Sequence, residues 1–144
     1  MDPTWTCPRC GRSFANRNQT HTCRPLGIVE DHLDRKPAAV IATYRALEAA
    51  VLACGPAEVL AERTRIAFHA RMSFASAVVR TWWVDVGLVL ARREDSPRFR
   101  SVESFSPRSH LQVVRLHSAE DVDDEVRTWL AEAYRVSLQQ HLGD

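Results

Sequence analysis

The sequence predicts an α+β fold, in which an antiparallel sheet of about five strands carries two main helices on one face. Residues 63–93 are the part of the chain richest in β-forming residues, and their apolar side chains alternate with a period of two. A segment with helical apolar spacing precedes them, and a second, acidic segment of that kind ends the chain. The order helix, strands, helix is typical of two helices packed on a single sheet.

Three runs form the centre of the expected sheet: Thr64–Ala70, Phe74–Trp83 and Val84–Ala91. In the first of these, Ile66 and Phe68 alternate with more polar neighbours, as in a half-buried strand. Residues 92–100 are polar and contain a proline, so they are expected to form a loop. Residues 99–105 and 110–116 are the expected fourth and fifth strands. One of the adjacent residues Trp82 and Trp83 is expected in the core and the other at a sheet edge.

The two main helices have clear end signals. Pro37 opens the first and Gly55 with Pro56 closes it, and the expected apolar stripe is Val40, Tyr44, Leu47 and Val51. Ser118 is the expected N-cap of the second helix, because five acids fill the following turns, where the helix dipole favours negative charge. Its expected buried face is Val122, Val126, Trp129, Ala133 and Tyr134. Residues 28–33 are expected to add one helical turn.

Four residues near the N-terminus have the spacing C-x2-C-x10-H-x-C, namely Cys7, Cys10, His21 and Cys23. Structural zinc is held by four such ligands in a tetrahedron, and a segment of roughly 25 residues cannot fold on its own core. We therefore predict one structural Zn²⁺ in a zinc finger spanning residues 1–26, followed by an α+β domain spanning residues 27–144. His32 is the alternative to His21, because a single residue separates His21 from Cys23.

The chain has no membrane-length apolar run and no signal-peptide pattern at its start. We therefore expect no membrane partner and a cytoplasmic location, where disulfides between the four cysteines are disfavoured.

Charge is segregated along the chain. Residues 63–117 hold ten arginines and four acids, a net charge of +6, whereas residues 118–144 hold seven acids and two arginines, a net charge of −5. The two segments are expected either to pair within the fold or to leave a basic surface for a partner. Arg9, Arg12, Arg17 and Arg24 give the finger a basic surface as well.

Several short motifs occur in a recognisable order: CPRCGRSF, QTHTC, VEDHL, TRIAFHARMSFA, WVDVGLVL, RSH and DVDDEVRTWLAEAY. Together they resemble a bacterial domain of unknown function, the DUF 5655 family, over nearly the whole chain. Related domains look like C-terminal partners of restriction-type nuclease modules, so the resemblance implies, by association only, work on nucleic acid.

The residues themselves favour a non-catalytic module. Lys36 is the only lysine, so a restriction-type acidic pair with a lysine cannot be assembled within the sheet. The residues after His69 and His110 do not fit a two-histidine phosphoesterase, and there is neither a G-x-S-x-G elbow nor a glycine-rich phosphate loop.

The expected ligand surface is the outward face of the strands, with Arg65, His69, Arg71, Arg108 and His110 as its basic residues. Guanidinium groups that share one surface suit phosphate or carboxylate ligands. We therefore favour DNA or RNA as the partner. A protein-interaction adaptor and a small phosphate or nucleotide ligand remain the alternatives, and base stacking on a tryptophan is a weaker possibility.

Overall fold

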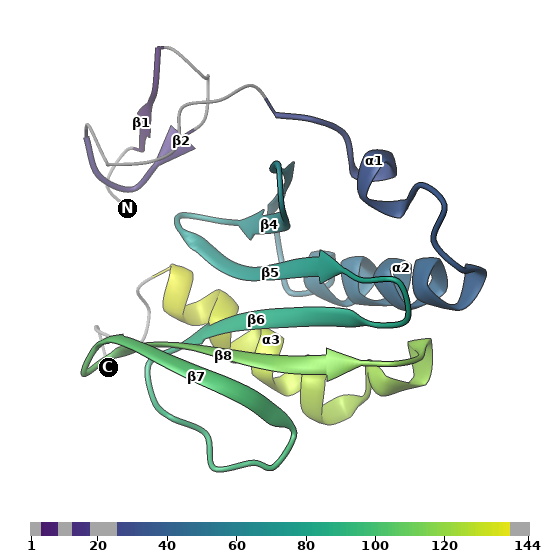
Figure 1. Ribbon diagram of the computed structural model, residues 1–144. Coiled ribbons are helices and arrows are strands. Elements are labelled where there is room, and N and C mark those ends of the chain that lie inside the picture. The colour runs from purple at the N-terminus through teal and green to yellow at the C-terminus, as the bar shows by residue number, and fades with distance from the viewer. Residues whose placement is uncertain (1–3, 9–12, 18–25, 139–144) are drawn as a thin grey trace.

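The structure is a computed structural model that describes residues 4–8, 13–17 and 26–138. The chain begins with a small antiparallel hairpin of β1 (Trp5–Thr6) and β2 (Ser13–Phe14). The rest is a mixed α+β arrangement built on a six-stranded antiparallel sheet (Figure 1). The fold class predicted from the sequence is therefore confirmed.

The sheet has the order β3-β4-β5-β6-β8-β7, and every neighbouring pair is antiparallel. Its strands are β3 (Glu58–Ala61), β4 (Ile66–His69), β5 (Ser73–Val79), β6 (Val84–Leu90), β7 (Phe99–Ser106) and β8 (Ser109–Leu116). The first four follow the chain order, but β8 inserts between β6 and β7. The loop after β6 therefore carries the chain past the position of β8 to the far edge.

The predicted number of about five strands was one too few, because β3 was not recognised. This strand has four residues, begins with a glutamate and ends with an alanine, so it lacks the β-branched alternation that identifies longer strands. It forms because β4 offers it an edge, with Val59 opposite Phe68 and Ala61 opposite Ile66. Pairing with β4 therefore stabilises a strand whose own sequence has little strand propensity.

Two long helices, α2 (Ala38–Leu52) and α3 (Asp124–Ser137), cover the same face of the sheet (Figure 1). A shorter helix, α1 (Val29–Leu33), precedes them. The predicted stripe of α2 is buried, and it joins strand residues such as Phe68, Val86 and Leu88 in one hydrophobic core. Burying side chains of this size stabilises the fold by roughly 1.5–3 kcal/mol each.

The turn after α2 is fixed by a glycine, as the sequence suggests. Gly55 has a φ of 151°, in a region that side-chain-bearing residues rarely adopt. A β-carbon there would lie 2.6 Å from the Tyr134 hydroxyl oxygen. That hydroxyl donates a hydrogen bond of 2.9 Å to the carbonyl of Pro56, so the turn also ties α2 to α3.

The predicted N-cap of the last helix is corrected by the structure. Ser118 precedes a short 3-10 helix, η1 (Ala119–Asp121), and α3 begins only after Asp123. The Asp123 carboxylate accepts a 3.0 Å hydrogen bond from the backbone N–H of Val126 and thereby caps α3. Both residues are good caps, and the non-helical conformation of Val122, with φ −79° and ψ 72°, separates the two helices.

The other face of the sheet carries neither α2 nor α3, and we call it the open face. The pairing places Ser76, Gly87 and Val113 side by side on it, with Val78 and Leu111 in neighbouring rows. At the β3–β4 side, the ring of Phe14 from β2 meets His69 edge-on, with centroids 6.2 Å apart.

Within the described residues, no helix is long and apolar enough to cross a membrane.

Candidate functional site

The structure does not gather the five predicted surface residues in one place. Arg65 precedes β4 at one end of the sheet, whereas the other four lie at the opposite end. His69 ends β4 and Arg71 follows in the β4–β5 turn, while Arg108 and His110 lie where β8 begins. Because β5 and β6 separate β4 from β8, the two pairs of residues are not neighbours.

The two predicted histidines are buried on opposite faces. His69 lies on the open face beneath Phe14. His110 pairs with Leu90 of the core, and its Nδ1 lies 2.7 Å from the Ser104 hydroxyl oxygen and its Nε2 3.0 Å from the carbonyl oxygen of Pro107. Alternation along β8 reverses the face with every residue, so His110 points to the helices while its neighbour Leu111 points to the open face.

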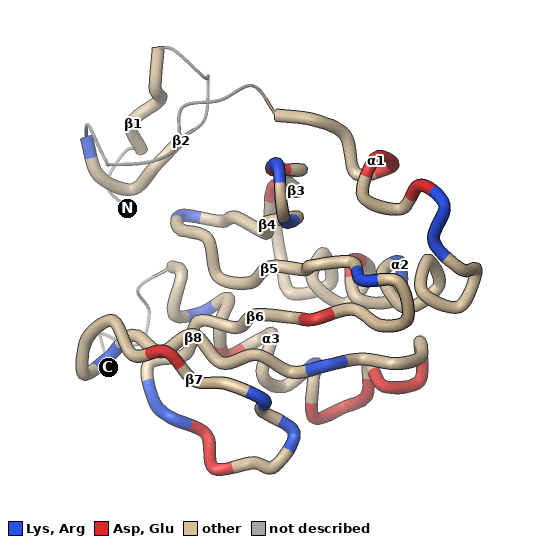
Figure 2. Tube along the Cα trace, in the orientation of Figure 1, with Lys and Arg blue, Asp and Glu red and all other residues tan. Residues whose placement is uncertain are grey.

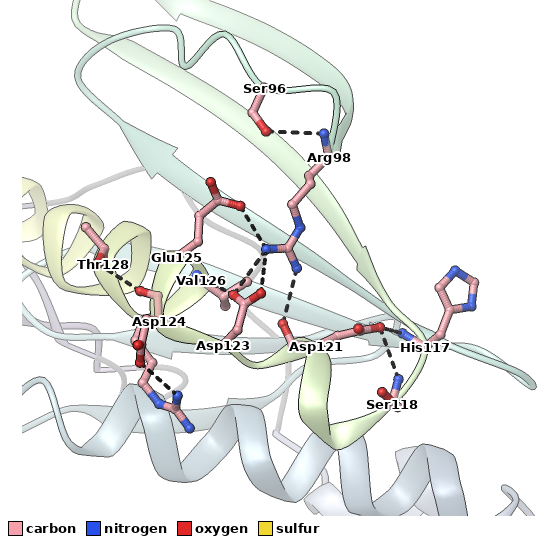
Figure 3. Close-up of polar contacts among 11 residues, drawn as sticks. Ser96, Arg98, His117, Ser118, Asp121, Asp123, Asp124, Glu125, Val126 and Thr128 are labelled. Carbon is pink, nitrogen blue, oxygen red and sulfur yellow. Dashed lines mark hydrogen bonds and ion pairs between the residues drawn. The ribbon is translucent and has the colours of Figure 1, made fainter.

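Two acids at the start of α3 pair with an arginine that lies outside the predicted surface. Figure 3 shows Asp123 and Glu125, at the start of α3, directed at Arg98 in the loop before β7. Arg98 Nη1 donates to both Asp123 oxygens at 3.1 and 3.0 Å and to Glu125 at 2.9 Å. Arg98 Nη2 donates to the carbonyl of Asp121, and the guanidinium lies 5.7 Å from the ring centroid of Trp129. This network fastens the loop onto the helix.

A different cluster forms where β5, β6 and β8 meet at the end of the sheet that bears Arg65. Asp85 pairs with Val78 on one side and with Arg115 on the other. Its carboxylate accepts hydrogen bonds from Arg115 Nε at 2.9 Å, from Arg80 Nε at 3.4 Å and from the indole Nε1 of Trp83 at 3.3 Å. Figure 2 shows the resulting alternation of positive, negative and positive residues across the three strands.

Asp85 orients this cluster. Partial burial acts to raise the pKa of the Asp85 carboxyl, but the hydrogen bond and charge of Arg115, followed by the hydrogen bonds from Trp83 and Arg80, outweigh it. The pKa of Asp85 therefore lies below its ordinary value, and the carboxylate stays charged at neutral pH. It fixes two guanidinium groups and one indole relative to each other.

Two further arginines lie at the same end. Arg63 is exposed in the β3–β4 turn, and Arg65 Nε donates to Glu62 at 2.7 Å. We call the end of the sheet that carries Arg63, Arg65, Arg80 and Arg115 the arginine end. Arg65 pairs with Glu62, and Arg80 and Arg115 pair with Asp85. These four arginines and two acids together carry a net charge of +2.

The arginines at this end share one geometry. Arg65, Arg80 and Arg115 each direct Nε at a carboxylate, and within the described part of the chain their terminal nitrogens donate no hydrogen bond. The side chains of Arg65 and Arg80 are 43% and 56% exposed. The terminal nitrogens are the groups that form bidentate bonds with phosphate or carboxylate ligands.

Sequence reasoning did not include Arg80 or Arg115 among the candidate site residues, and it considered Trp83 only as one of two adjacent tryptophans with a weaker base-stacking role. The alternation of β6 places Asp85 on the open face, which is the one signal that an arginine partner should be sought there. It does not say which strand lies beside β6. The expectation that either Trp82 or Trp83 is a core residue was wrong: Trp83 is half-buried on the open face, and Trp82 is exposed in the β5–β6 turn.

Of the predicted zinc ligands, only Cys7 belongs to the described residues, and it is buried at the end of β1. Cys10, His21 and Cys23 lie outside the described residues. Residues 4–8, 13–17 and 26–138 contain no group of three or more His, Cys, Asp or Glu side chains placed to hold a metal ion. His32, the alternative ligand, has its Nε2 2.7 Å from the carbonyl oxygen of Glu62.

Comparison with known proteins identifies the main domain. The family model described as "Domain of unknown function (DUF5655)" matches residues 29–137. No curated protein and no solved structure matches the chain. The matched residues run from the start of α1 to the end of α3, so they include the whole six-stranded sheet and both covering helices. The protein therefore belongs to the DUF5655 family of domains of unknown function.

Proposed function

We propose that this protein is a non-catalytic module that binds nucleic acid through the arginine end of its sheet. The supporting observation is the common orientation of Arg65, Arg80 and Arg115, whose Nε atoms are held by acids while their terminal nitrogens remain available. Each guanidinium is thereby pre-oriented, so less side-chain entropy is lost when a phosphate binds.

A ligand with several phosphates fits this surface better than a single phosphate does. The arginines come from the β3–β4 turn, from the β5–β6 turn and from β8, so they are spread over several strands of the sheet. The open face continues from them without a covering α2 or α3 (Figure 1). Nucleic acid offers phosphates at regular intervals along such a surface.

We also propose that the N-terminal segment holds one structural Zn²⁺. The β1–β2 hairpin brackets residues 7–12, which contain the C-x2-C pair, and buried Cys7 stands at its entrance. In structural zinc sites, a C-x2-C pair commonly supplies two of the four ligands. Such a metal stabilises a segment too small for a core of its own and supplies no reaction chemistry.

The experiment is a titration of fluorescent DNA and RNA oligomers at increasing salt. We expect binding at low salt that weakens steeply, because releasing counterions from Z phosphates gives a log–log slope of about −0.9Z on duplex DNA. The double variant Arg63→Gln/Arg80→Gln should weaken binding to all sequences and reduce the slope by about one for each lost phosphate contact.

The matched control is Arg135→Gln. Arg135 is also exposed, but it belongs to the last turn of α3, on the helix-covered side of the sheet. This variant should bind like the natural protein. The proposal fails if no oligomer binds at low salt, or if the control variant loses as much affinity as the double variant.

A protein-interaction adaptor is the second candidate. It is favoured by the half-buried apolar residues Val78, Val89, Leu111 and Val113, which line the middle of the open face. An adaptor would bind its partner with little salt dependence, and Leu111→Ser would weaken that binding more than Arg63→Gln/Arg80→Gln.

A further inference from the structure

Among the described residues, Trp82 is the most exposed of the large apolar side chains, at 68%. It lies with Thr81 in the turn that joins β5 to β6, and the backbone N–H of Arg80 closes this turn by donating 2.8 Å to the carbonyl of Trp83. An indole offers one of the largest apolar surfaces of any side chain, and leaving it in water forfeits the gain from burying it. The fold places this residue at the tip of a hairpin, where none of the described helices or strands covers it.

The neighbouring Trp83 is the tryptophan of this turn that contacts the sheet. Arg115 lies over its ring, with the guanidinium carbon 4.1 Å from the ring centroid, and its Nε1 is bonded to Asp85. In the described parts of the chain, Trp82 by contrast has no ring contact, cation–π contact or hydrogen bond. Its indole faces therefore remain available to a ligand.

The arginines close to Trp82 indicate which class of ligand its indole could contact. Arg80 stands two residues before it, with its terminal nitrogens unpaired within the described residues, and Arg115 lies beside Trp83. An aromatic ring next to phosphate-binding groups is the arrangement with which proteins hold single strands: bases stack on the ring while the backbone follows the positive charges.

We propose that Trp82 stacks on an unpaired base, so that the ligand of the arginine end is single-stranded nucleic acid. The inference rests on the proposed function and narrows it. In a duplex, each base is stacked between its neighbours, and a protruding indole reaches a base face only after unstacking. The site therefore favours strands whose bases are already unpaired.

The test compares three probes of equal length: an oligothymidine of roughly ten nucleotides, within the site sizes of single-strand-binding folds, an abasic oligomer with the same phosphates, and the corresponding duplex. Trp82→Ala should weaken oligothymidine binding roughly 5- to 100-fold, the range for losing one base–aromatic stack. The same variant should bind the abasic oligomer with unchanged affinity. Trp82→Phe should retain most of the affinity, because a phenyl ring also stacks.

Two measurements separate stacking from a general loss of surface. Phe105→Ala removes another exposed aromatic residue, 61% exposed, from the far end of the sheet and should change nothing. Oligothymidine should quench the tryptophan fluorescence of the natural protein, and most of this quenching should vanish in Trp82→Phe.

The outcomes distinguish the inference from the function on which it rests. If no probe binds, the proposed function fails as well. If the abasic oligomer or the duplex binds through Arg63 and Arg80 but Trp82→Ala has no effect, only the stacking inference is overturned. It is also overturned if thymidine monophosphate displaces oligothymidine at equal concentration, because the ligand would then be a mononucleotide.

Discussion

The guanidinium carbon of Arg115 lies 4.1 Å from the centroid of the Trp83 indole, and both side chains donate to the same carboxylate, that of Asp85. The acid thus holds a cation against an aromatic face on a part of the sheet that neither α2 nor α3 covers. Arg115 cannot move without losing both the ring and the acid, so its terminal nitrogens have a defined position. This rigidity gives the proposed ligand surface a hydrogen-bond donor group in a fixed position.

Replacing the orienting acid should destabilise the protein. In Asp85→Asn, the charge that holds Arg80 and Arg115 disappears from a side chain that is only 12% exposed. We expect a loss of about 2 kcal/mol in the free energy of unfolding at neutral pH, the usual size for hydrogen bonds to charged groups. Urea denaturation measures this loss. Glu103→Gln, an exposed change at the β7 edge, should cost almost nothing.

The same interaction should weaken in acid. The folded state holds the pKa of Asp85 below the ordinary value of 3.8, so the stabilisation is fully present above that pH. It is lost as the pH falls through the lowered pKa, because the carboxyl then takes up a proton in the folded state too. The stability gap between the natural protein and Asp85→Asn should therefore narrow below pH 3.8. A gap that is constant with pH would contradict the assignment.

Arg98 should contribute more to stability than its surface position suggests. Its guanidinium donates charged hydrogen bonds to Asp123 and Glu125 and a further hydrogen bond to the carbonyl of Asp121, and it lies over the ring of Trp129. We expect Arg98→Ala to lower the free energy of unfolding by about 2 kcal/mol. Arg98→Lys should retain only part of this stabilisation, because an ammonium group lacks the planar, forked set of donors of a guanidinium.

The control for Arg98 is another arginine near the start of α3. Arg127 pairs with Asp124 at 3.6 Å, and both side chains are largely exposed. Arg127→Ala should therefore change stability by less than about 0.5 kcal/mol, as is usual for surface ion pairs. If Arg98→Ala and Arg127→Ala lower the stability equally, the Arg98 network contributes no more to stability than a surface ion pair does.

The N-terminal segment should carry one equivalent of zinc after dialysis. Cys7→Ser and Cys23→Ser should lose the metal, whereas Cys54→Ser, a half-buried residue beyond the end of α2, should keep it. His21→Ala should lose zinc and His32→Ala should keep it, because His32 Nε2 already bonds to the carbonyl of Glu62. Metal retention in both cysteine variants would show that the segment holds no zinc site of this composition.

A chain that begins at Gly27 should still unfold cooperatively. The hydrophobic core extends from Leu33 to Ala133, and the backbone N–H of Gly27 bonds to the carbonyl of Ala61 at 2.9 Å. The truncated chain loses the contact of Phe14 with His69, so its melting temperature should fall. Phe14→Ala in the full chain should reproduce part of that fall, and a broad transition of the truncated chain would show that the N-terminal segment belongs to the core.

The sequence by itself determined the class of the fold and the nature of its main elements. Alternation along residues 66–68 and 84–90 identified strands, and Pro37 with Gly55 bounded the first long helix, because these signals are local and each follows from the geometry of one element. The family resemblance also rested on local motifs, and the family model confirms it for residues 29–137. The N-terminal zinc finger stays a prediction from ligand spacing.

Only the tertiary structure decided which residues share a surface. A period of two assigns each side chain to a face, but it does not say which strand lies next to which. Because β8 pairs with β6 and its register sets Asp85 opposite Arg115 and Leu90 opposite His110, Arg115 lies beside Asp85 and His110 faces the core. The predicted group of basic residues was therefore dispersed, and the arginine end formed from residues whose proximity depends on long-range strand pairing.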